Sequence, residues 1–190
     1  MGGHLTLRAL AESRLAADAV VLVAPMLGLK SAPFGARVAA KVAHFMTRIG
    51  RPERMAWKAN ERPSVPGASR RALLTHDADR YDDELWWKAH KPEIAVGPPS
   101  WAWVAEAYRS TLALERPGRL EHIQVLILLL GAEADRLVDA AAIRRAAARL
   151  PRAELHMFGR ESAHEILREA DPVRRQALTL IERFLDTHAR

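Results

Sequence analysis

The sequence contains no cysteine among its 190 residues. It therefore has no disulfide framework, no thiol nucleophile and no cysteine-ligated metal site. Its eight histidines show no metal-ligand spacing with partner residues, so we expect neither a metal nor any other cofactor. A reducing compartment such as the cytoplasm is compatible with this composition.

Long apolar runs are also scarce. The stretch from Met1 to Leu10 has no apolar signal-peptide core, and the run from Ala19 to Leu29 is interrupted by Pro25. We therefore expect no transmembrane segment and a cytoplasmic location, with contact to a membrane limited to peripheral association.

Charge is biased toward basic residues, with a formal net charge of +6. This bias alone would fit an anionic partner, whose binding would weaken steeply with salt. However, the arginines are spread along helix-like segments such as 144–149, and no recognised DNA or RNA motif accompanies them. We therefore expect no nucleic-acid partner.

The apolar residues that are present predict a buried parallel sheet. Val125 to Leu130 is a continuous apolar run without polar alternation, which is typical of a parallel strand covered by helices on both faces. We extend this strand back to Ile123 and expect Gly131 to end it. Ala19 to Ala24 and Glu154 to Phe158 are two further strand candidates. The alternation of strands with helical segments predicts an α/β fold.

Proline and tryptophan divide the chain into two regions. From Met26 to Gly118 the prolines are frequent and all five tryptophans occur, which suggests a helical cap (26–118) inserted into a core formed by residues 1–25 and 119–190. Residues 51–71 read as an irregular loop. The clearest predicted helices are Gly2 to Arg14, Gly35 to Ile49, Trp101 to Leu114, Ala140 to Leu150 with Asp139 as its N-cap, and Pro172 to His188.

Two polar residues follow predicted strands and form the candidate site. Asp135 comes after the Ile123 to Leu130 strand, and His164 comes after the next strand. Loops at the carboxyl ends of parallel strands meet at one edge of the sheet, where ligands and catalytic groups are placed. An acid can fix the tautomer of a histidine, which then takes a proton near neutral pH. Asp139 and Glu133 compete as the acid, and an acid at such a place is often only a turn former or a helix cap.

Three motifs resemble the monoacylglycerol lipase and lysophospholipase group of serine alpha/beta hydrolases. Gly131-Ala-Glu-Ala-Asp135-Arg-Leu-Val138 is similar to the acid loop of that group, and Ala163-His164-Glu165-Ile166-Leu167, with Glu169 and Asp171, resembles its histidine loop. Met1-Gly2-Gly3-His4 looks like the end of its nucleophile elbow, Gly-His-Ser-Met-Gly-Gly-His. The resemblance implies the C-terminal part of an alpha/beta-hydrolase fold.

The same resemblance implies carboxylic-ester hydrolysis of lipid-like substrates, such as monoacylglycerols or lysophospholipids. Asp135 and His164 would be two members of a catalytic triad, and the backbone N–H of Met1 would bind the oxyanion. The serine would precede Met1, so we expect a chain truncated just after its nucleophile. No serine in the sequence lies in a Gly-x-Ser-x-Gly setting: Ser13, Ser31, Ser64, Ser69, Ser100, Ser110 and Ser162.

A second hypothesis is that the chain is a non-catalytic remnant or an interaction protein. The Ala19 to Ala24 strand would lack a neighbour on one side, and an open apolar edge favours self-association.

Four tryptophans are candidates for a substrate pocket. The resemblance implies that Trp86, Trp87, Trp101 and Trp103 line an acyl-chain pocket in the cap. Aromatic residues of this kind more often form the packing of the cap itself. Both alternatives remain open at the level of sequence.

Overall fold

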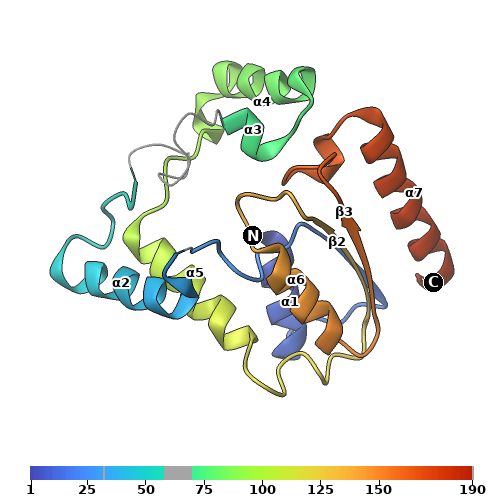
Figure 1. Cartoon of the computed structure of the whole chain (residues 1–190), viewed down its shortest axis with the longest axis horizontal. Coiled ribbons are helices and arrows are strands. Elements are labelled where there is room, and N and C mark those ends of the chain that lie inside the picture. The colour runs from blue at the N-terminus through green and yellow to red at the C-terminus, as the bar shows by residue number, and fades with distance from the viewer. Residues whose placement is uncertain (32, 58–69, 190) are drawn as a thin grey trace.

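A three-stranded parallel sheet forms the centre of the chain (Figure 1). The computed structural model describes residues 1–31, 33–57 and 70–189. The strands lie in the order β1-β2-β3, with Ala19 beside Leu126 and Ile127 beside Ala153. The predicted α/β class is confirmed. The strands are β1 (Ala19–Val23), β2 (Leu126–Ala132) and β3 (Ala153–Phe158).

Helices cover both faces of this sheet. In β2, Ile127 and Leu129 pack into the cluster formed with α1 and α6, whereas Leu128 and Leu130 pack against α7 on the opposite face (Figure 1). All four side chains are buried, which explains why β2 lacks polar alternation. The helices of the described chain are α1 (Gly2–Ala11), α2 (Gly35–Ile49), α3 (Arg70–Leu74), α4 (Ala78–His90), α5 (Trp101–Leu114), α6 (Ala140–Arg149) and α7 (Asp171–His188), with 3-10 turns η1 (Pro92–Ile94) and η2 (Ile166–Arg168).

Gly131 does not end β2, as the sequence led us to predict. The strand continues to Ala132, and Gly131 pairs with Met157 of β3. A Cβ atom on Gly131 would lie 2.6 Å from the sulfur of Met157. The glycine therefore serves close packing between β2 and β3 rather than strand termination.

The helix boundaries follow local capping. Asp139 accepts a hydrogen bond from Ala141 N at 3.0 Å, which confirms its predicted role as the N-cap of α6. Helix α1 ends three residues earlier than predicted, just before Ser13 adopts a left-handed conformation with φ of 54°. The sequence did not predict α4, whose N-cap Asp77 accepts from Arg80 N.

The chain between β1 and β2 contains α2 to α5. The bounds of α2 and α5 agree with those predicted. Helix α5 contacts both regions, because Val104 packs toward α2 whereas Leu114 packs into the core beside α1 and β2. The larger part of the predicted irregular loop, residues 58–69, lies outside the described residues, and the division into core and cap remains a prediction. Along the described part of the chain, no helix has the length and hydropathy needed to cross a bilayer.

Candidate active site

Asp135 lies in the loop that follows β2, and its side chain is completely buried. One carboxylate oxygen, Oδ1, accepts hydrogen bonds from Leu137 N at 2.7 Å and Val138 N at 2.9 Å. The Lys30 ammonium donates to the backbone carbonyl of the same residue. These contacts fix the loop and leave the second carboxylate oxygen available for a partner.

That partner is His164, in the loop that follows β3. Its Nδ1 lies 2.7 Å from Oδ2 of Asp135. A carboxylate can only accept, so Nδ1 carries the proton and Nε2 of the neutral ring has a free lone pair. The imidazole side chain retains 22% exposure, whereas the carboxylate has none. A buried acid that orients a partly exposed imidazole is an arrangement suited to general base catalysis.

The two competing acids have other partners. Asp139 caps α6 and lies 3.4 Å from Arg145, and the exposed Glu133 pairs with Arg144. Among the described residues, no three histidine, aspartate or glutamate side chains cluster as metal ligands would. The geometry thus brings together Asp135 and His164 out of the predicted candidates.

Glu169 is a second buried carboxylate and it holds the histidine loop. Its Oε1 accepts from Ala163 N at 2.6 Å, and its Oε2 accepts from His76 N at 3.0 Å. The ring Nδ1 of His76 lies 3.1 Å from Oε1. Glu165, which directly follows His164, donates its N–H to the carbonyl of Leu74. The loop that carries His164 is therefore tied to the segment between α3 and α4.

A mainly apolar cavity of about 580 Å³ lies beside His164. Met1 is part of its wall, so the start of α1 and the imidazole face one space. The sequence missed two further members of this wall: Trp57, and Ser100, whose hydroxyl caps α5 by accepting from Trp103 N. Neither carries a local motif by which it could have been found. The other apolar members include Met26, Leu29, Val96, Trp103, Leu137 and Val138.

The structure separates the four predicted pocket tryptophans. Trp103 lies in the cavity wall, whereas Trp101 packs against the cluster between α2 and α5. Trp86 and Trp87 lie on α4, about half exposed, and contact each other edge to face. Of the four, only Trp103 is among the residues that line this cavity, and a substrate-binding role for the tryptophans stays a prediction.

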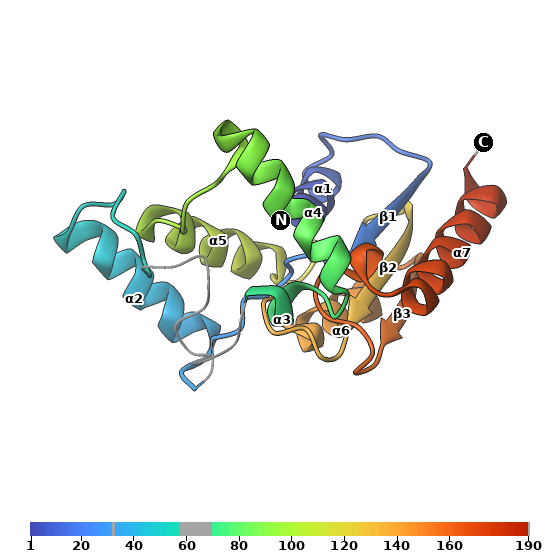
Figure 2. The ribbon, with the colours of Figure 1, turned by 90° about the horizontal axis from the view of Figure 1, so that it is seen from above.

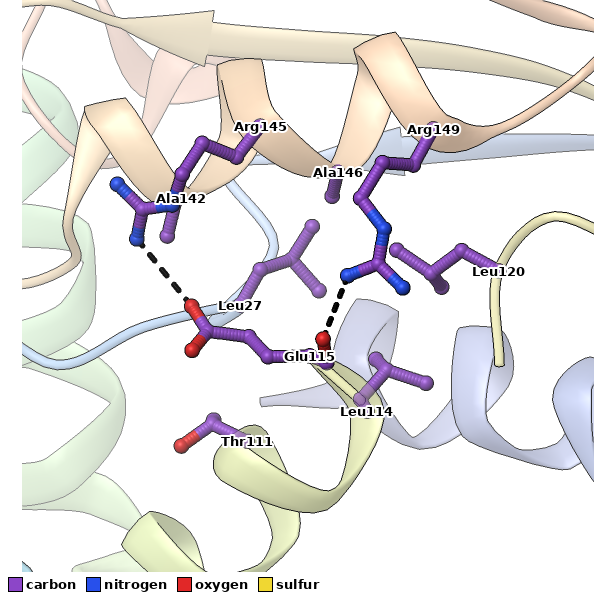
Figure 3. A pocket seen from close by; sticks show the side chains of 9 residues that line it. All are labelled: Leu27, Thr111, Leu114, Glu115, Leu120, Ala142, Arg145, Ala146 and Arg149. Atoms are coloured by element: carbon purple, nitrogen blue, oxygen red, sulfur yellow. Dashed lines mark hydrogen bonds and ion pairs between the residues drawn. The ribbon is translucent and has the colours of Figure 1, made fainter. Parts of the chain in front are cut away.

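A smaller cavity of about 180 Å³ lies between α6 and the end of α5 (Figure 3). Arg145 reaches Glu115 at 3.2 Å across it, and Arg149 donates to the carbonyl of Glu115 at 2.8 Å (Figure 3). Both guanidinium groups are thus partnered within the protein. No acid and base are brought together here as they are beside His164.

His4, on the inner face of α1, is packed within the protein and contacts α5. It is buried, with Nε2 2.7 Å from Oγ of Ser110 on α5, and Arg8 donates to the same hydroxyl at 2.7 Å. Burial, followed by the nearby charge of Arg8, lowers the pKa of His4 to about 4. The ring is therefore neutral at physiological pH and joins α1 to α5.

These features agree with one family. The family model described as serine aminopeptidase, S33 matches residues 1–171. The chain belongs to this family of alpha/beta hydrolases.

Curated relatives extend well beyond the matched region. Lysophospholipase L2 of Escherichia coli strain K12 is 32% identical over 213 residues, which cover 99% of this chain and 56% of the relative. A probable lysophospholipase L2 of Haemophilus influenzae is 31% identical over 98 residues, which cover 52% of this S33 family chain and 30% of the Haemophilus protein. The chain thus spans about half the length of the Escherichia coli relative.

Solved structures share the fold. A monoglyceride lipase from Saccharomyces cerevisiae, in complex with a substrate analogue, superposes with a TM-score of 0.72 at 12% identity, covering 97% of this chain and 58% of the lipase. The monoacylglycerol lipase of Paleococcus ferrophilus gives a TM-score of 0.71 at 18% identity, covering 97% and 65% respectively. At these identities the likeness concerns the fold.

Proposed function

We propose that Asp135 and His164 are the acid and the base of a serine hydrolase site that cleaves carboxylic esters of lipids. The observation that carries this proposal is the 2.7 Å contact between His164 Nδ1 and a fully buried Asp135 carboxylate. It leaves Nε2 free to accept a proton from an attacking hydroxyl.

Each residue has a distinct task in this reaction. A serine hydroxyl attacks the ester carbonyl while His164 takes its proton, and Asp135 stabilises the imidazolium that forms. The imidazolium then gives the proton to the leaving alcohol. The ester bond breaks and the acyl group stays on the serine. A water molecule then attacks this acyl group while His164 takes its proton, and the proton passes to the serine oxygen as the carboxylic acid leaves.

The nucleophile in this proposal is a serine joined directly to the amino side of Met1. Two observations support it: Met1-Gly2-Gly3-His4 resembles the end of a nucleophile elbow, and Met1 shares the cavity wall with His164. Helix α1 begins at Gly2, so the Met1 N–H would lie among the unpaired donors of a helix start. That N–H is our candidate donor to the oxyanion.

The cavity wall and the relatives support a proposal for the substrate class. Met26, Leu29 and Trp103 give the space beside His164 an apolar character that suits an acyl chain. Relatives bear the names lysophospholipase and monoglyceride lipase. We therefore propose lysophospholipids or monoacylglycerols as substrates.

The test is turnover of a short-chain monoacylglycerol by the chain preceded by a segment ending in Gly-His-Ser. We expect hydrolysis that falls by roughly 10³- to 10⁴-fold in Asp135→Asn and His164→Ala. The chain without that segment should not exceed the His164→Ala background. Equal turnover with and without it would contradict the proposal.

Two matched controls separate this site from its neighbours. Ser100→Ala removes a hydroxyl from the cavity wall, and Asp139→Asn changes the competing acid next along the chain. Both should keep turnover within about threefold, because loss of the Ser100 helix cap costs only about 1 kcal/mol of stability and asparagine caps a helix about as well as aspartate. A normal rate in Asp135→Asn would assign the acid to another residue.

A further inference from the structure

Helix α2 exposes most of its large apolar side chains and turns its small ones toward the protein. Four alanines face the protein and pack toward Val104 and Tyr108 of α5. The larger residues point away from it and are 47 to 62% exposed: Val38, Val42, Phe45 and Ile49. An amphipathic helix in a globular protein normally buries its larger apolar residues. These alanines are Ala36, Ala39 and Ala40, which are partly buried, and Ala43, which is fully buried.

The exposed residues form one continuous stripe. Their spacing from the first is four, seven and eleven positions, which places them on one side of an α-helix along its whole length. Phe34, just before the helix, and Met55, just after it, are also exposed. Exposure of such a stripe to water is unfavourable in free energy unless another surface covers it.

A basic row runs beside this apolar stripe. Arg37, Lys41 and Arg48 lie one position before Val38, Val42 and Ile49, so they occupy the adjacent side of the helix. Helix α2 contains no acidic residue, and none of these three cations forms an ion pair with a described side chain. By contrast, the arginines of α6 pair with glutamates.

The position of α2 leaves this face accessible. Both views place α2 at the end of the molecule opposite α7, away from the sheet (Figures 1 and 2). Its inner side belongs to a cluster that includes Trp57 and Trp103, which also line the cavity beside His164. Helix α2 and the side chains of this cluster thus lie between the outer face and the proposed acyl site.

We infer that this outer face of α2 docks on the surface of a bilayer that contains anionic phospholipid. The apolar stripe enters the boundary between headgroups and acyl chains, while the basic row binds lipid phosphates. Charge complementarity selects this partner: a row of cations with no ion-pair partner among the described side chains, beside bulky apolar residues, matches an anionic lipid surface better than an acidic soluble peptide. The inference concerns binding and does not depend on ester turnover.

The test is sedimentation of the chain with vesicles of phosphatidylcholine, with and without phosphatidylglycerol. We expect preferential binding to the anionic vesicles that weakens as salt rises. Replacing the basic row by Arg37→Gln, Lys41→Gln and Arg48→Gln should weaken that binding on the order of a hundredfold. Replacing Phe45→Ser and Ile49→Ser should weaken binding to both vesicle types by at least about tenfold.

A control of equal charge change lies on α7. Arg174→Gln, Arg175→Gln and Arg183→Gln remove three exposed cations at the other end of the molecule and should leave vesicle binding within about twofold. Equal losses in the α7 and α2 charge variants would overturn the inference, as would failure of the native chain to bind anionic vesicles. Dimers that dissociate in Phe45→Ser and Ile49→Ser, without vesicle binding, would assign the face to a second copy instead.

Discussion

His4 is buried, and its Nε2 lies within hydrogen-bond distance of the Ser110 hydroxyl. Arg8 donates to the Ser110 oxygen, so the Ser110 hydroxyl proton can point to Nε2 of His4. The other ring nitrogen, Nδ1, has no hydrogen-bond partner among the described residues. Protonation of His4 would place a second positive charge beside Arg8 in a buried site.

Stability should therefore decrease as pH falls through the range of this group. In the unfolded chain a histidine binds a proton below pH about 6.5, whereas burial holds the folded pKa at about 4. Between these values the unfolded state binds more protons, so acid favours unfolding by roughly 2 to 3 kcal/mol in total. Denaturant unfolding from pH 7 to pH 4 measures this loss.

The control for this prediction is His4→Gln, which has no titrating ring. Its free energy of unfolding should fall less between pH 6.5 and pH 4 than that of the native chain. Carboxylates contribute equally to both curves, so parallel curves would show that His4 does not account for the slope.

At the scale of elements, the loop after β3 depends on its tie to the segment between α3 and α4. Glu169 accepts from the N–H groups of Ala163 and His76 on its two oxygens, and His164 lies between Ala163 and Glu169 in sequence. Thr75 adds a hydrogen bond from its hydroxyl to the carbonyl of Arg168 at 2.7 Å. The orientation of His164 is thus set partly by residues from the region between β1 and β2.

Glu169→Gln should loosen this tie. A glutamine has one acceptor oxygen in place of two, so a buried N–H of Ala163 or His76 would lose its partner at a cost of about 1 to 3 kcal/mol. In the chain preceded by Gly-His-Ser, we expect kcat to fall about tenfold or more with little change in KM, because the substrate cavity is not altered. Chemical unfolding and ester kinetics measure the two effects.

Glu154→Gln is the matched change at an exposed site. Glu154 lies at the surface on β3 and contacts His188 at 3.4 Å, so its loss should change stability by less than about 0.5 kcal/mol. A kcat for Glu169→Gln equal to that of Glu154→Gln would remove the positioning role of Glu169.

At the scale of the molecule, β1 forms an edge of the described sheet. It pairs with β2 on one side, and Ala24 donates its N–H to Leu130 on that side. Backbone groups alternate in direction along a strand, so those of Val21 and Val23 face the open side. An apolar strand with free backbone groups is a template for pairing with another chain.

We therefore expect this chain by itself to self-associate through β1. Sedimentation velocity should show dimers or larger species that persist at high salt. Val21→Pro removes an outward N–H and should shift the distribution toward monomer, with circular dichroism checking that the helices remain. Phe45→Ser with Ile49→Ser, on α2, should not have this effect. A monodisperse native monomer that unfolds cooperatively would contradict the expectation.

Much of the architecture was predictable because it depends on local signals. The apolar run of β2 predicted a strand covered on both faces, and Asp139 predicted the start of α6. Asp135 and His164 were predictable because loops after neighbouring parallel strands share one edge of the sheet. Helix α4 was missed; its sequence is rich in charged residues, and it buries none of its side chains.

The sequence by itself determined the strands, the helices that follow them and the pair of polar residues at their ends, because these depend on the order of apolar and polar residues along the chain. Only the tertiary structure decided which residues share a space. It placed Trp103 and Trp57 beside His164 but Trp86 on the surface, and it showed that Gly131 fits Met157 and does not end a strand. These outcomes depend on contacts between segments distant in sequence, and no local pattern records such contacts.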